Sequence, residues 1–482
     1  MTRDWRDDRI EQLERENAAF RARVGELEKI AAEQAKLIEE LRELLSRSSS
    51  NSSKPPSTDP KKAGARRKKV KSGRKQGAQH GHPKHERPLV GVDEVDKVVS
   101  CHPECCENCH GPLQDRGTAP IRHQVWELPV CKPLVTEFQQ HAGWCQQCVH
   151  WTVAPLPKGV PTGSFGPSVV AMVGTLIGRF RLSKRLTCDA LLTLFRLSIS
   201  VGAVINCQNQ LSEALAGSVA EASDHVQQQN VKNADETGWR QHNERAWLWV
   251  ALSGAIVVFM IHARRSAEAA NKLLGEIHGV LGTDRYAAYL HWPAQLHQVC
   301  WAHLKRDFQA IGERRGEAGR IGKALLEQER LLFGLWGRLQ AGTLSRSTFQ
   351  QQVRPIRETM LDLLVDGLRC RHGKTRRTCD KMLEVFDSFW TFVRLEGVEP
   401  TNNAAERAVR HGVLYRTICL GTQSEAGSRF VERILTVEAT LRRQRRDMLQ
   451  FLTQTCRAAL NATTPPSLIH ADPIPVALPI AA

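Results

Sequence analysis

Three acidic residues, far apart in the sequence, lie in contexts suited to metal-dependent chemistry. Asp235, in NADETGW (233–239), is expected at the end of a short strand, where a glycine turn would leave its carboxylate facing open space. Asp284, in GTDRY (282–286), follows a similar strand, and Glu406, in TNNAAER (401–407), is expected near the start of a helix. Carboxylates suit hard ions such as Mg²⁺. Two such ions about 4 Å apart can activate a nucleophile and stabilise the leaving oxygen in phosphodiester cleavage.

Each acid also has a purely structural interpretation. Asp235 and Asp284 occur in sequences typical of turns, in which the carboxylate bonds its own backbone. With Asn403 as N-cap, Glu406 would be the glutamate of a capping box, bonding back to the cap amide. Taken one at a time, these interpretations are no weaker than the catalytic one. Spacing and residue type alone therefore do not select the three acids.

Cysteines are concentrated in one segment of the chain. Seven of the 14 lie between residues 101 and 148, which favours a metal site over a disulfide framework. Two pairs could hold one structural Zn²⁺ through four thiolates, because a two-residue spacer lets both sulfurs of a pair point at the same ion; these are Cys106 with Cys109 and Cys145 with Cys148. Nearby substitutes leave the ligand set open, namely Cys101, His102, Cys105, His110 and Cys131. A cluster of reduced thiols is the alternative.

The charge balance favours a polyanionic partner. Lys and Arg outnumber Asp and Glu by 67 to 51, giving a net charge of +16, and phosphate neutralisation makes nucleic acid the first candidate. Residues 61–75 contain nine basic and no acidic side chains, as expected of an arm that follows a phosphate backbone without reading bases. A solvated tail is the alternative, and RNA would suit the arm equally. The candidate contacts are Arg66, Arg67, Lys68, Lys69, Lys71, Arg74 and Lys75.

A heptad pattern predicts a coiled coil over residues 1–46. Apolar residues recur at its two core positions, which are Ile10, Val24, Ala31, Ile38 and Leu45, then Leu13, Phe20, Leu27 and Leu41. Asn17 occupies a core position, where a buried amide can fix register. Gly25 and Gln34 weaken the helix. We expect a homo-oligomer; an amphipathic helix packed on its own globule is the alternative.

Composition divides the rest of the chain. We expect a disordered basic linker over 47–90, a zinc-binding domain over 91–160 and a helical segment over 161–230. An α/β catalytic domain should follow over 231–446, with a helical insertion at about 310–395. A C-terminal tail is expected over 447–482, and its part after residue 463, which contains several prolines and few charges, is expected to be disordered or loosely attached.

Neither a membrane span nor an export signal is expected. The longest apolar run, residues 246–261, is shorter than a spanning helix and is interrupted by Ser253 and Gly254, so it predicts two buried strands joined by a turn. The charged N-terminus lacks the apolar stretch of a signal peptide. A cytoplasmic protein is the expectation, associated with the nucleoid if DNA is its partner.

Several short sequences together resemble the bacterial insertion-sequence-66 transposase family. They occur in the family's order and cover most of the chain, to about residue 446: SNSSKPPS (50–57), ADETG (234–238), TDRYAAY (283–289), CWAHLKR (300–306) and TNNAAER (401–407). The chain departs from the family at Arg285, where Gly or Ala is more frequent, and in its additional Cys and His residues. The second departure blurs the choice of zinc ligands.

The resemblance implies a multidomain α/β protein with an RNase-H-like core, preceded by a zinc-binding module. Asp235, Asp284 and Glu406 match the family's Asp, Asp, Glu triad, which uses two Mg²⁺ ions or Mn²⁺. His303 is interpreted as a DNA contact, a residue supporting the site or a structural histidine. Basic residues beside the second and third acids are candidate DNA contacts, namely Lys305, Arg306, Arg407 and Arg410.

The implied function is that of an insertion-sequence transposase. Subunits would bind the element's terminal inverted repeats, hydrolyse a strand at each end and join the 3′-hydroxyl to target DNA, with element-encoded accessory proteins as further possible partners. A non-catalytic DNA-binding regulator and a structure-selective nuclease are the alternatives. The regulator would show no metal-dependent cleavage, and the nuclease would cleave without joining.

Overall fold

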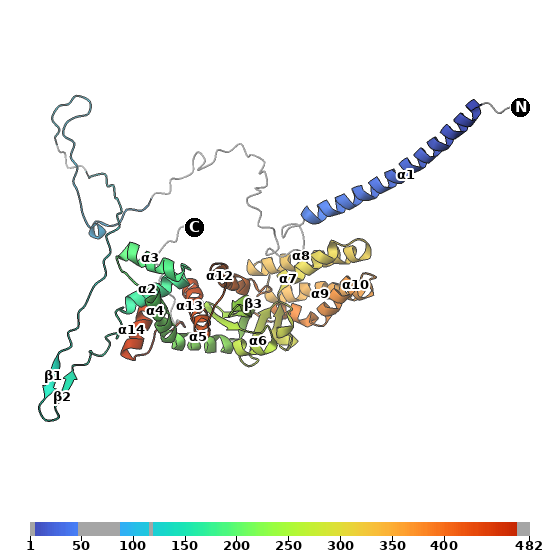
Figure 1. Ribbon diagram of the computed structural model, residues 1–482. Helices are drawn as coiled ribbons and strands as arrows, with labels where there is room; N and C mark the ends of the chain where they lie inside the picture. The colour runs from blue at the N-terminus through green and yellow to red at the C-terminus, as the bar shows by residue number, and fades with distance from the viewer. Residues whose placement is uncertain (1–4, 47–86, 115–118, 470–482) are drawn as a thin grey trace. The chain divides into compact units, whose positions relative to one another are not determined.

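The computed structural model describes residues 5–46, 87–114 and 119–469. The chain is a mixed α/β protein with a central sheet and many helices (Figure 1). It divides into two compact units. One contains residues 60–133 with 194–196, and the other contains residues 1–59, 134–193 and 197–482. None of the helices in the described part of the chain has the length and apolarity needed to cross a membrane.

A long helix, α1 (Trp5–Ser46), occupies the N-terminal segment for which a coiled coil is expected. Apolar residues of the predicted seam are exposed on it: Phe20 is 68% exposed, Val24 51%, Leu27 58% and Ile38 49%. Exposed apolar side chains at heptad spacing leave a surface that a second helix could cover.

The cysteine-rich region contains little regular structure. A short 3₁₀ helix, η2 (Val92–Glu94), lies in the first unit. A two-stranded antiparallel hairpin, β1 (Ala142–Cys145) and β2 (His150–Val153), lies in the second. The rings of Trp144 and Trp151, paired across the hairpin, have centroids 5.3 Å apart. Residues 47–86, which include the predicted basic arm, lie outside the described residues.

Four helices precede the sheet, as their apolar spacing predicts. They are α2 (Pro167–Gly178), α3 (Lys184–Phe195), α4 (Val201–Ala214) and α5 (Ala216–Gln228). Gly174 lies where α2 crosses α4 closely, since a Cβ built there would come within 2.1 Å of the Leu211 side chain. Ser200 caps α4 by accepting a hydrogen bond from the Ala203 amide.

A five-stranded sheet forms the centre of the larger unit, with strand order β5-β4-β3-β6-β7. β3 pairs antiparallel with β4, and β4 with β5, whereas β3–β6 and β6–β7 are parallel. The predicted strand pair within 246–261 is present as β4 and β5, joined by a turn at Gly254. The strands are β3 (Val231–Gln241), β4 (Glu244–Ser253), β5 (Ile256–His262), β6 (Val280–Thr283) and β7 (His297–Val299). Three short elements connect them: α6 (Ala267–Leu274), η3 (Ala287–Tyr289) and η4 (Ala294–Leu296).

The free edge of β5 is covered by α13 (Glu425–Gln444). Three alternate amides of the strand donate to side chains spaced four residues apart on the helix. The bonds are Val257 to Thr440 (3.0 Å), Phe259 to Thr436 (3.0 Å) and Ile261 to Glu432 (2.5 Å). A sheet edge otherwise offers unpaired amides to other chains. These three side chains of α13 therefore satisfy the amides at the edge of the sheet while the edge stays buried.

Replacing Glu432 with Gln should flatten the pH dependence of stability. Burial raises the pKa of Glu432 from 4.5 to about 7, although Arg429 lies 2.9 Å away. The folded protein therefore binds the proton more tightly than the unfolded chain, and stability falls as the pH rises from 4.5 to 7. The fall should amount to about 2 to 3 kcal/mol. Urea unfolding across this pH range would measure it. An equal slope in Glu432→Gln would contradict the assignment, and exposed Glu358→Gln is the control.

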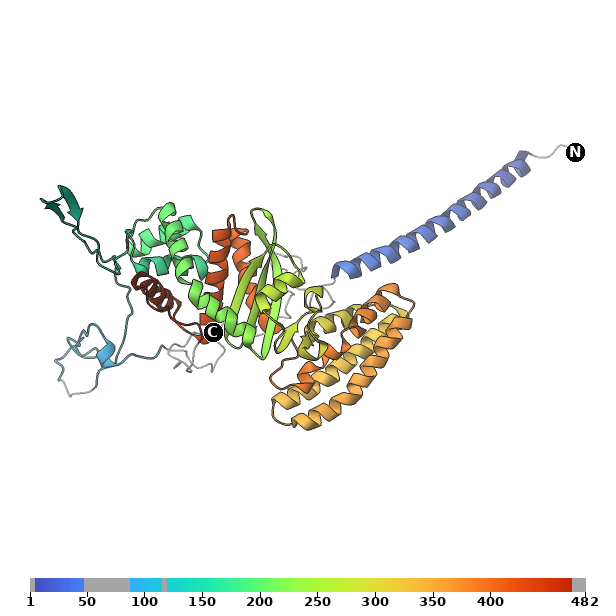
Figure 2. The same ribbon diagram turned by 90° about the horizontal axis from the view of Figure 1, so that it is seen from below.

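A helical insertion lies between β7 and the last helices of the core, as the apolar spacing predicts. Figure 2 shows α8 to α10 side by side, apart from the sheet. Leu325, Met360 and Leu364 are among the residues buried in its apolar core. The elements are α7 (Trp301–Gly312), α8 (Gly316–Gln340), α9 (Arg346–Arg369), α10 (Gly373–Leu383), η5 (Phe386–Phe389) and α11 (Thr391–Arg394).

The C-terminal region is packed more closely than the sequence predicts. α12 (Asn403–Cys419) lies against β3 and β4, and α14 (Met448–Asn461) packs against α2. Beyond α14, the Leu468 side chain is fully buried and its carbonyl accepts from Gln444 (2.7 Å). The expectation of a loosely attached tail is therefore wrong for residues 464–469. A single buried leucine among prolines carries no periodic signal.

Candidate active site

Asp235 lies within β3 rather than at its end. The predicted glycine turn is absent, because β3 continues through Gly238 to Gln241. Arg416 of α12 approaches the strand here and donates to the Gly238 carbonyl, and an added Cβ would lie 3.4 Å from it, an ordinary van der Waals contact. The turn-forming interpretation of Asp235 is therefore wrong. Its Oδ1 accepts from the Glu236 amide (2.9 Å) within the strand.

Strand alternation directs Asp235 toward α12. Asp235 pairs with Val250 of β4, and Leu248, two residues away on the same face, meets α12 at Gly412. Cross-strand partners share a face of a sheet and successive residues alternate between faces. The carboxylate of Asp235 therefore lies on the side of the sheet covered by the helix that carries Glu406.

The parallel pairing of β3 with β6 brings Asp284 to the same region as Asp235. The last registered pair of β3 and β6 is Asn233 with Gly282, so Asp235 and Asp284 each lie two residues beyond it. The Asp284 Oδ1 accepts from the Tyr286 amide (2.9 Å), which is the turn bond that its structural interpretation predicts. This bond orients the carboxylate and leaves its other oxygen available.

Glu406 lies in the first turns of α12 but does not form the predicted capping box. The N-cap is Asn402 rather than Asn403, and no side chain caps this helix. The Glu406 carboxylate instead turns toward α7, with Oε1 3.5 Å from His303 Nδ1 and 3.8 Å from the Arg306 guanidinium. The capping-box interpretation is therefore wrong, because the helix begins one residue earlier than it requires.

Asn402 ties the start of α12 to the strand that carries Asp235. Its side chain accepts from Asn233 Nδ2 (2.9 Å) and donates to the Ala234 carbonyl (2.7 Å). Its amide donates to Cys300 Sγ (3.1 Å). Asn402 is only 1% exposed, so these bonds replace water that the buried amide would otherwise need. Sequence reasoning missed this role of Asn402, because its partners Asn233, Ala234 and Cys300 lie 169, 168 and 102 positions away.

Replacing Asn402 with Ala should weaken both the fold and the chemistry. Two buried side-chain bonds would be lost, which costs about 1 to 3 kcal/mol. Glu406 would lose its anchor to β3, and displacing a metal ligand by about 1 Å can lower a rate by about a hundredfold. Thermal unfolding and magnesium-dependent DNA cleavage would measure the two effects. Asn403→Ala, at an exposed neighbouring position, should change neither appreciably.

The structure brings the three acids within electrostatic range of one another. Burial is the main reason that the pKa of Asp235 rises from 3.8 to about 8, and the charges of Glu236, Asp284 and Glu406 raise it further. Such a shift means that the ionised cluster lacks enough compensating positive charge. A divalent cation between the carboxylates would supply it.

Glu236, the neighbour of Asp235, points to the opposite face and is already compensated. Arg265 donates to it through Nε (2.8 Å) and Nη2 (2.5 Å), and the Tyr289 hydroxyl donates to its other oxygen. Glu236 therefore acts as a buried anchor for the loops that follow β5 and β6. Sequence reasoning missed this role because it ended the strand too early, and alternation along a longer strand would have separated the two acids.

The donor set fits hard divalent ions. Asp235, Asp284 and Glu406 provide carboxylate oxygens from three separate elements, which Mg²⁺ and Mn²⁺ favour. Glu406 Oε1 is buried and makes no hydrogen bond in the described structure; its charged neighbours, His303 and Arg306, lie 3.5 and 3.8 Å away. The residues present therefore fit a metal site beside the middle of β3 and just beyond the end of β6.

The predicted basic contacts fall into four groups. Lys305 Nζ donates to both carboxylate oxygens of Glu329, at 3.0 Å each. Arg306 lies beside Glu406. Arg407 and Arg410 are exposed on α12. The seven predicted contacts in the arm, from Arg66 to Lys75, lie outside the described residues.

The two cysteine pairs form similar local turns. The amides of Cys109 and Asn108 face the Cys106 thiol and lower its pKa, and those of Cys148 and Gln147 do the same for Cys145. Amides directed at sulfur stabilise a thiolate, the form that binds zinc. Cys106 and Cys109 belong to one compact unit, and Cys145 and Cys148 to the other.

Comparison with known proteins defines the class of this protein. Residues 165–429, more than half of the chain, match the profile described as the Transposase IS66 family. The chain belongs to the IS66 family of transposases. Residues 4–88 also match a family of unknown function (DUF6444). The chain is 23% identical over 399 residues to "Uncharacterized protein y4hP" of Sinorhizobium fredii (strain NBRC 101917 / NGR234), covering 74% of this chain and 70% of that protein.

Proposed function

We propose that this protein is an active DDE-type transposase that cleaves and joins DNA at the ends of a bacterial insertion sequence. The observation that carries the proposal is the strand pairing and the contact between β3 and α12: Asp235 and Asp284 each lie two residues beyond the last registered pair of β3 and β6, and Asn402 ties the start of the helix that carries Glu406 to β3. The family membership supports the same reaction class. Binding of the terminal inverted repeats follows from this proposal.

The catalytic domain is inferred to be RNase-H-like. Supporting this, three antiparallel strands are followed by two parallel ones in the order β5-β4-β3-β6-β7. The first acid lies on the central strand β3, the second follows the parallel neighbour β6, and the third comes from the later helix α12. The helical insertion separates the second acid from the third in the sequence.

The three carboxylates would hold two Mg²⁺ ions, or Mn²⁺. When bound, such ions activate the attacking oxygen and stabilise the leaving one. Asp235 provides a ligand from a rigid central strand, while the Tyr286 amide fixes Asp284 and Asn402 fixes the start of α12. Water serves as nucleophile in cleavage and the freed 3′-hydroxyl in joining, so one site can perform both steps.

DNA would reach this site through sequence-independent contacts. Arg407 and Arg410 are exposed on the helix that bears Glu406, and Arg306 lies beside it. Arg residues can hold phosphates through bidentate hydrogen bonds. The arm at 61–75 would add backbone contacts, and the pairs Cys106 with Cys109 and Cys145 with Cys148 are each proposed as ligands for structural Zn²⁺. Lys305 is the weakest candidate for a DNA contact because its ammonium group already donates a hydrogen bond to Glu329.

The exposed seam of α1 is proposed to join subunits. Replacing Val24 with Asp would place a charge in that seam, and the protein should then sediment as a smaller species than the wild type, because a buried unpaired charge opposes association. Glu26→Asp, in the same helix and charge-conserving, is the control. Identical sedimentation of Val24→Asp and wild type would contradict the assignment of the seam.

Cleavage and joining can be tested with DNA that carries the regions flanking the gene. Wild-type protein with Mg²⁺ should nick these ends and, given pre-cut ends, join them to a target plasmid. Asp284→Asn should do neither. Cleavage without any joined product would favour a nuclease. Specific binding without cleavage by the wild type would favour a non-catalytic regulator, and either result would overturn the proposal.

A further inference from the structure

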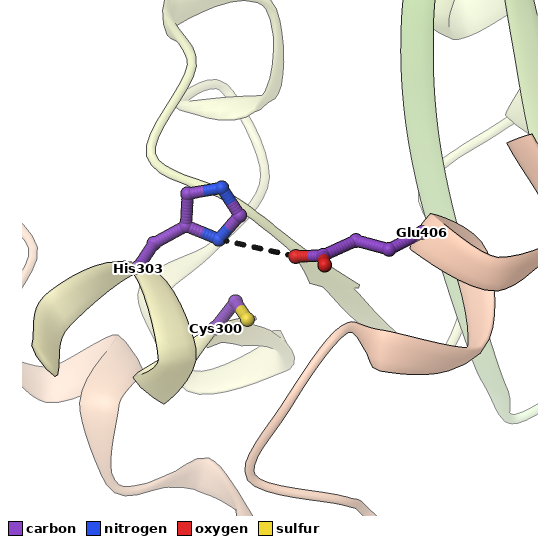
Figure 3. Close-up of side chains that lie close together, drawn as sticks. All are labelled: Cys300, His303 and Glu406. Carbon is purple, nitrogen blue, oxygen red and sulfur yellow. Dashed lines mark ion pairs between the residues drawn. The ribbon is translucent and has the colours of Figure 1, made fainter. Parts of the chain in front are cut away.

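Cys300, His303 and Glu406 form a second cluster of metal-ligating groups beside the three acids. One ligand atom from each lies within 4.8 Å of the other two. His303 Nδ1 and Glu406 Oε1 are 3.5 Å apart, and Figure 3 shows both pointing toward the space above the Cys300 sulfur. Neither Asp235 nor Asp284 belongs to this cluster.

The local fold explains why these groups meet. Cys300 is the N-cap of α7 and His303 lies one turn later, with its amide donating to the Cys300 carbonyl (3.1 Å). Trp301, between them, points into the core and is fully buried. The two ligands are therefore held on one side of a fixed helix start, and Glu406 approaches from α12.

Two atoms of the cluster have ion-pair partners but no hydrogen bond: His303 Nδ1 and Glu406 Oε1 lie 3.5 Å from each other, and Glu406 Oε1 lies 3.8 Å from Arg306. His303 Nδ1 and Glu406 Oε1 are buried and make no hydrogen bond in the described structure. Buried polar atoms are rarely left unsatisfied. A cation between them would satisfy both, and the Asn402 amide already donates to Cys300 Sγ (3.1 Å), a contact that also stabilises a metal-bound thiolate.

We propose that Cys300, His303 and Glu406 bind a thiophilic divalent cation, with Zn²⁺ the ion of best fit, and that its binding withdraws Glu406 from the catalytic ions. The second part rests on the proposed function; the first does not. Zinc accepts S, N and O ligands tetrahedrally at about 2.0 to 2.3 Å, which places neighbouring ligand atoms about 3.3 to 3.7 Å apart. The His303 to Glu406 separation of 3.5 Å already lies in this range.

The chemistry separates this ion from the catalytic ones. Mg²⁺ prefers oxygen ligands and does not favour a thiolate, whereas Zn²⁺ binds thiolate and imidazole readily. On binding, the Cys300 thiol releases its proton to solvent and His303 binds as the neutral ring. Water would fill the fourth position, since the side chains of His303 and Glu406 are 32% and 37% exposed. Zinc at this site would therefore inhibit magnesium-supported DNA joining.

Zinc content measures the site without any DNA reaction. Full-length protein would be dialysed against buffered Zn²⁺ without Mg²⁺ and its zinc counted by mass spectrometry. Cys300→Ser, His303→Gln and Glu406→Gln should each hold about one zinc fewer per chain than the wild type. The matched control is Cys370→Ser, another buried cysteine, which should match the wild type. His303→Gln tests the site at a more exposed position if Cys300→Ser unfolds. Equal zinc in His303→Gln and wild type would overturn the site.

Inhibition tests the link to Glu406. Zinc would be titrated into magnesium-supported strand joining, with each variant normalised to its own zinc-free rate. The concentration for half inhibition should rise at least about tenfold in Cys300→Ser and stay unchanged in Cys370→Ser. An unchanged value in Cys300→Ser would overturn the withdrawal of Glu406. If no protein joins DNA, the proposed function fails, and the zinc count still decides the site.

Discussion

Replacing Asp235 with Asn is expected to abolish magnesium-dependent cleavage without destabilising the fold. The substitution removes one carboxylate from the proposed metal ligands, and loss of about 4 kcal/mol of transition-state stabilisation would lower the rate about a thousandfold. The hydrogen bond from the Glu236 amide can persist, because the Asn oxygen also accepts. Nicking of the flanking DNA would measure the loss.

Asp235→Asn should increase the folding stability of the protein, although it lowers the rate of cleavage. The pKa of Asp235 is raised from 3.8 to about 8, so metal-free wild-type protein loses stability as the pH rises from about 4 to 8. A neutral Asn avoids this cost, and Asp235→Asn should be more stable at pH 7 by about 1 to 3 kcal/mol. Urea unfolding with and without Mg²⁺ would show it, since only wild type should gain stability from the ion.

A matched substitution separates this effect from general loss of charge. Asp366 lies on α9, with its side chain 59% exposed, and Asp366→Asn should retain cleavage and stability. If Asp235→Asn cleaves as fast as the wild type, Asp235 does not act as a metal ligand and the proposed site is wrong.

Replacing Trp301 with Ala should be the most destabilising single change in the described core. Trp301 is fully buried and its ring lies 5.3 to 6.3 Å from those of Phe333, Phe389, Trp390 and Phe392. Its Nε1 donates to the Phe389 carbonyl (2.8 Å). Truncating a buried Trp to Ala leaves a large cavity and costs about 3 to 5 kcal/mol.

A smaller change at the same position would separate the contribution of the hydrogen bond from that of the aromatic ring. Trp301→Phe keeps an aromatic ring but removes one of two donors to the Phe389 carbonyl, which still accepts from Gln298 Nε2 (3.3 Å). It should cost about 1 to 3 kcal/mol for the lost hydrogen bond and the smaller volume. Equilibrium unfolding in urea would rank the two variants. Equal stability of Trp301→Ala and wild type would mean that α7 is not anchored through this residue.

The sequence predicted the elements whose signals are local. The apolar run at 246–261, broken at Ser253 and Gly254, gave two strands, and helical spacing gave the insertion. β3 was cut short because Thr237-Gly238 looks like a turn. The Gly238 carbonyl instead accepts a hydrogen bond from Arg416 of α12, a contact between residues 178 positions apart, which no local pattern can reveal.

The candidate site was predicted in part. The three acids were chosen through family motifs; the strand pairing explains the positions of Asp235 and Asp284, and α12 carries Glu406. The supporting contacts could not be predicted, because Asn402 meets Asn233 across 169 positions and Cys300 gains its role only when α12 begins beside α7. The choice of zinc ligands among the cysteines remains a prediction.

The segment from Trp301 to Pro400 leaves and re-enters the core at nearly the same point, since the Trp301 amide donates to the Pro400 carbonyl (3.0 Å). Chain segments whose ends meet can be lengthened at small entropic cost, because that cost grows only with the logarithm of length. The spacing between the second and third acids can therefore drift during evolution while their separation in space is preserved. The number of residues between Asp284 and Glu406 is therefore a poor criterion for recognising relatives. The hydrogen bond between Trp301 and Pro400 is a better criterion.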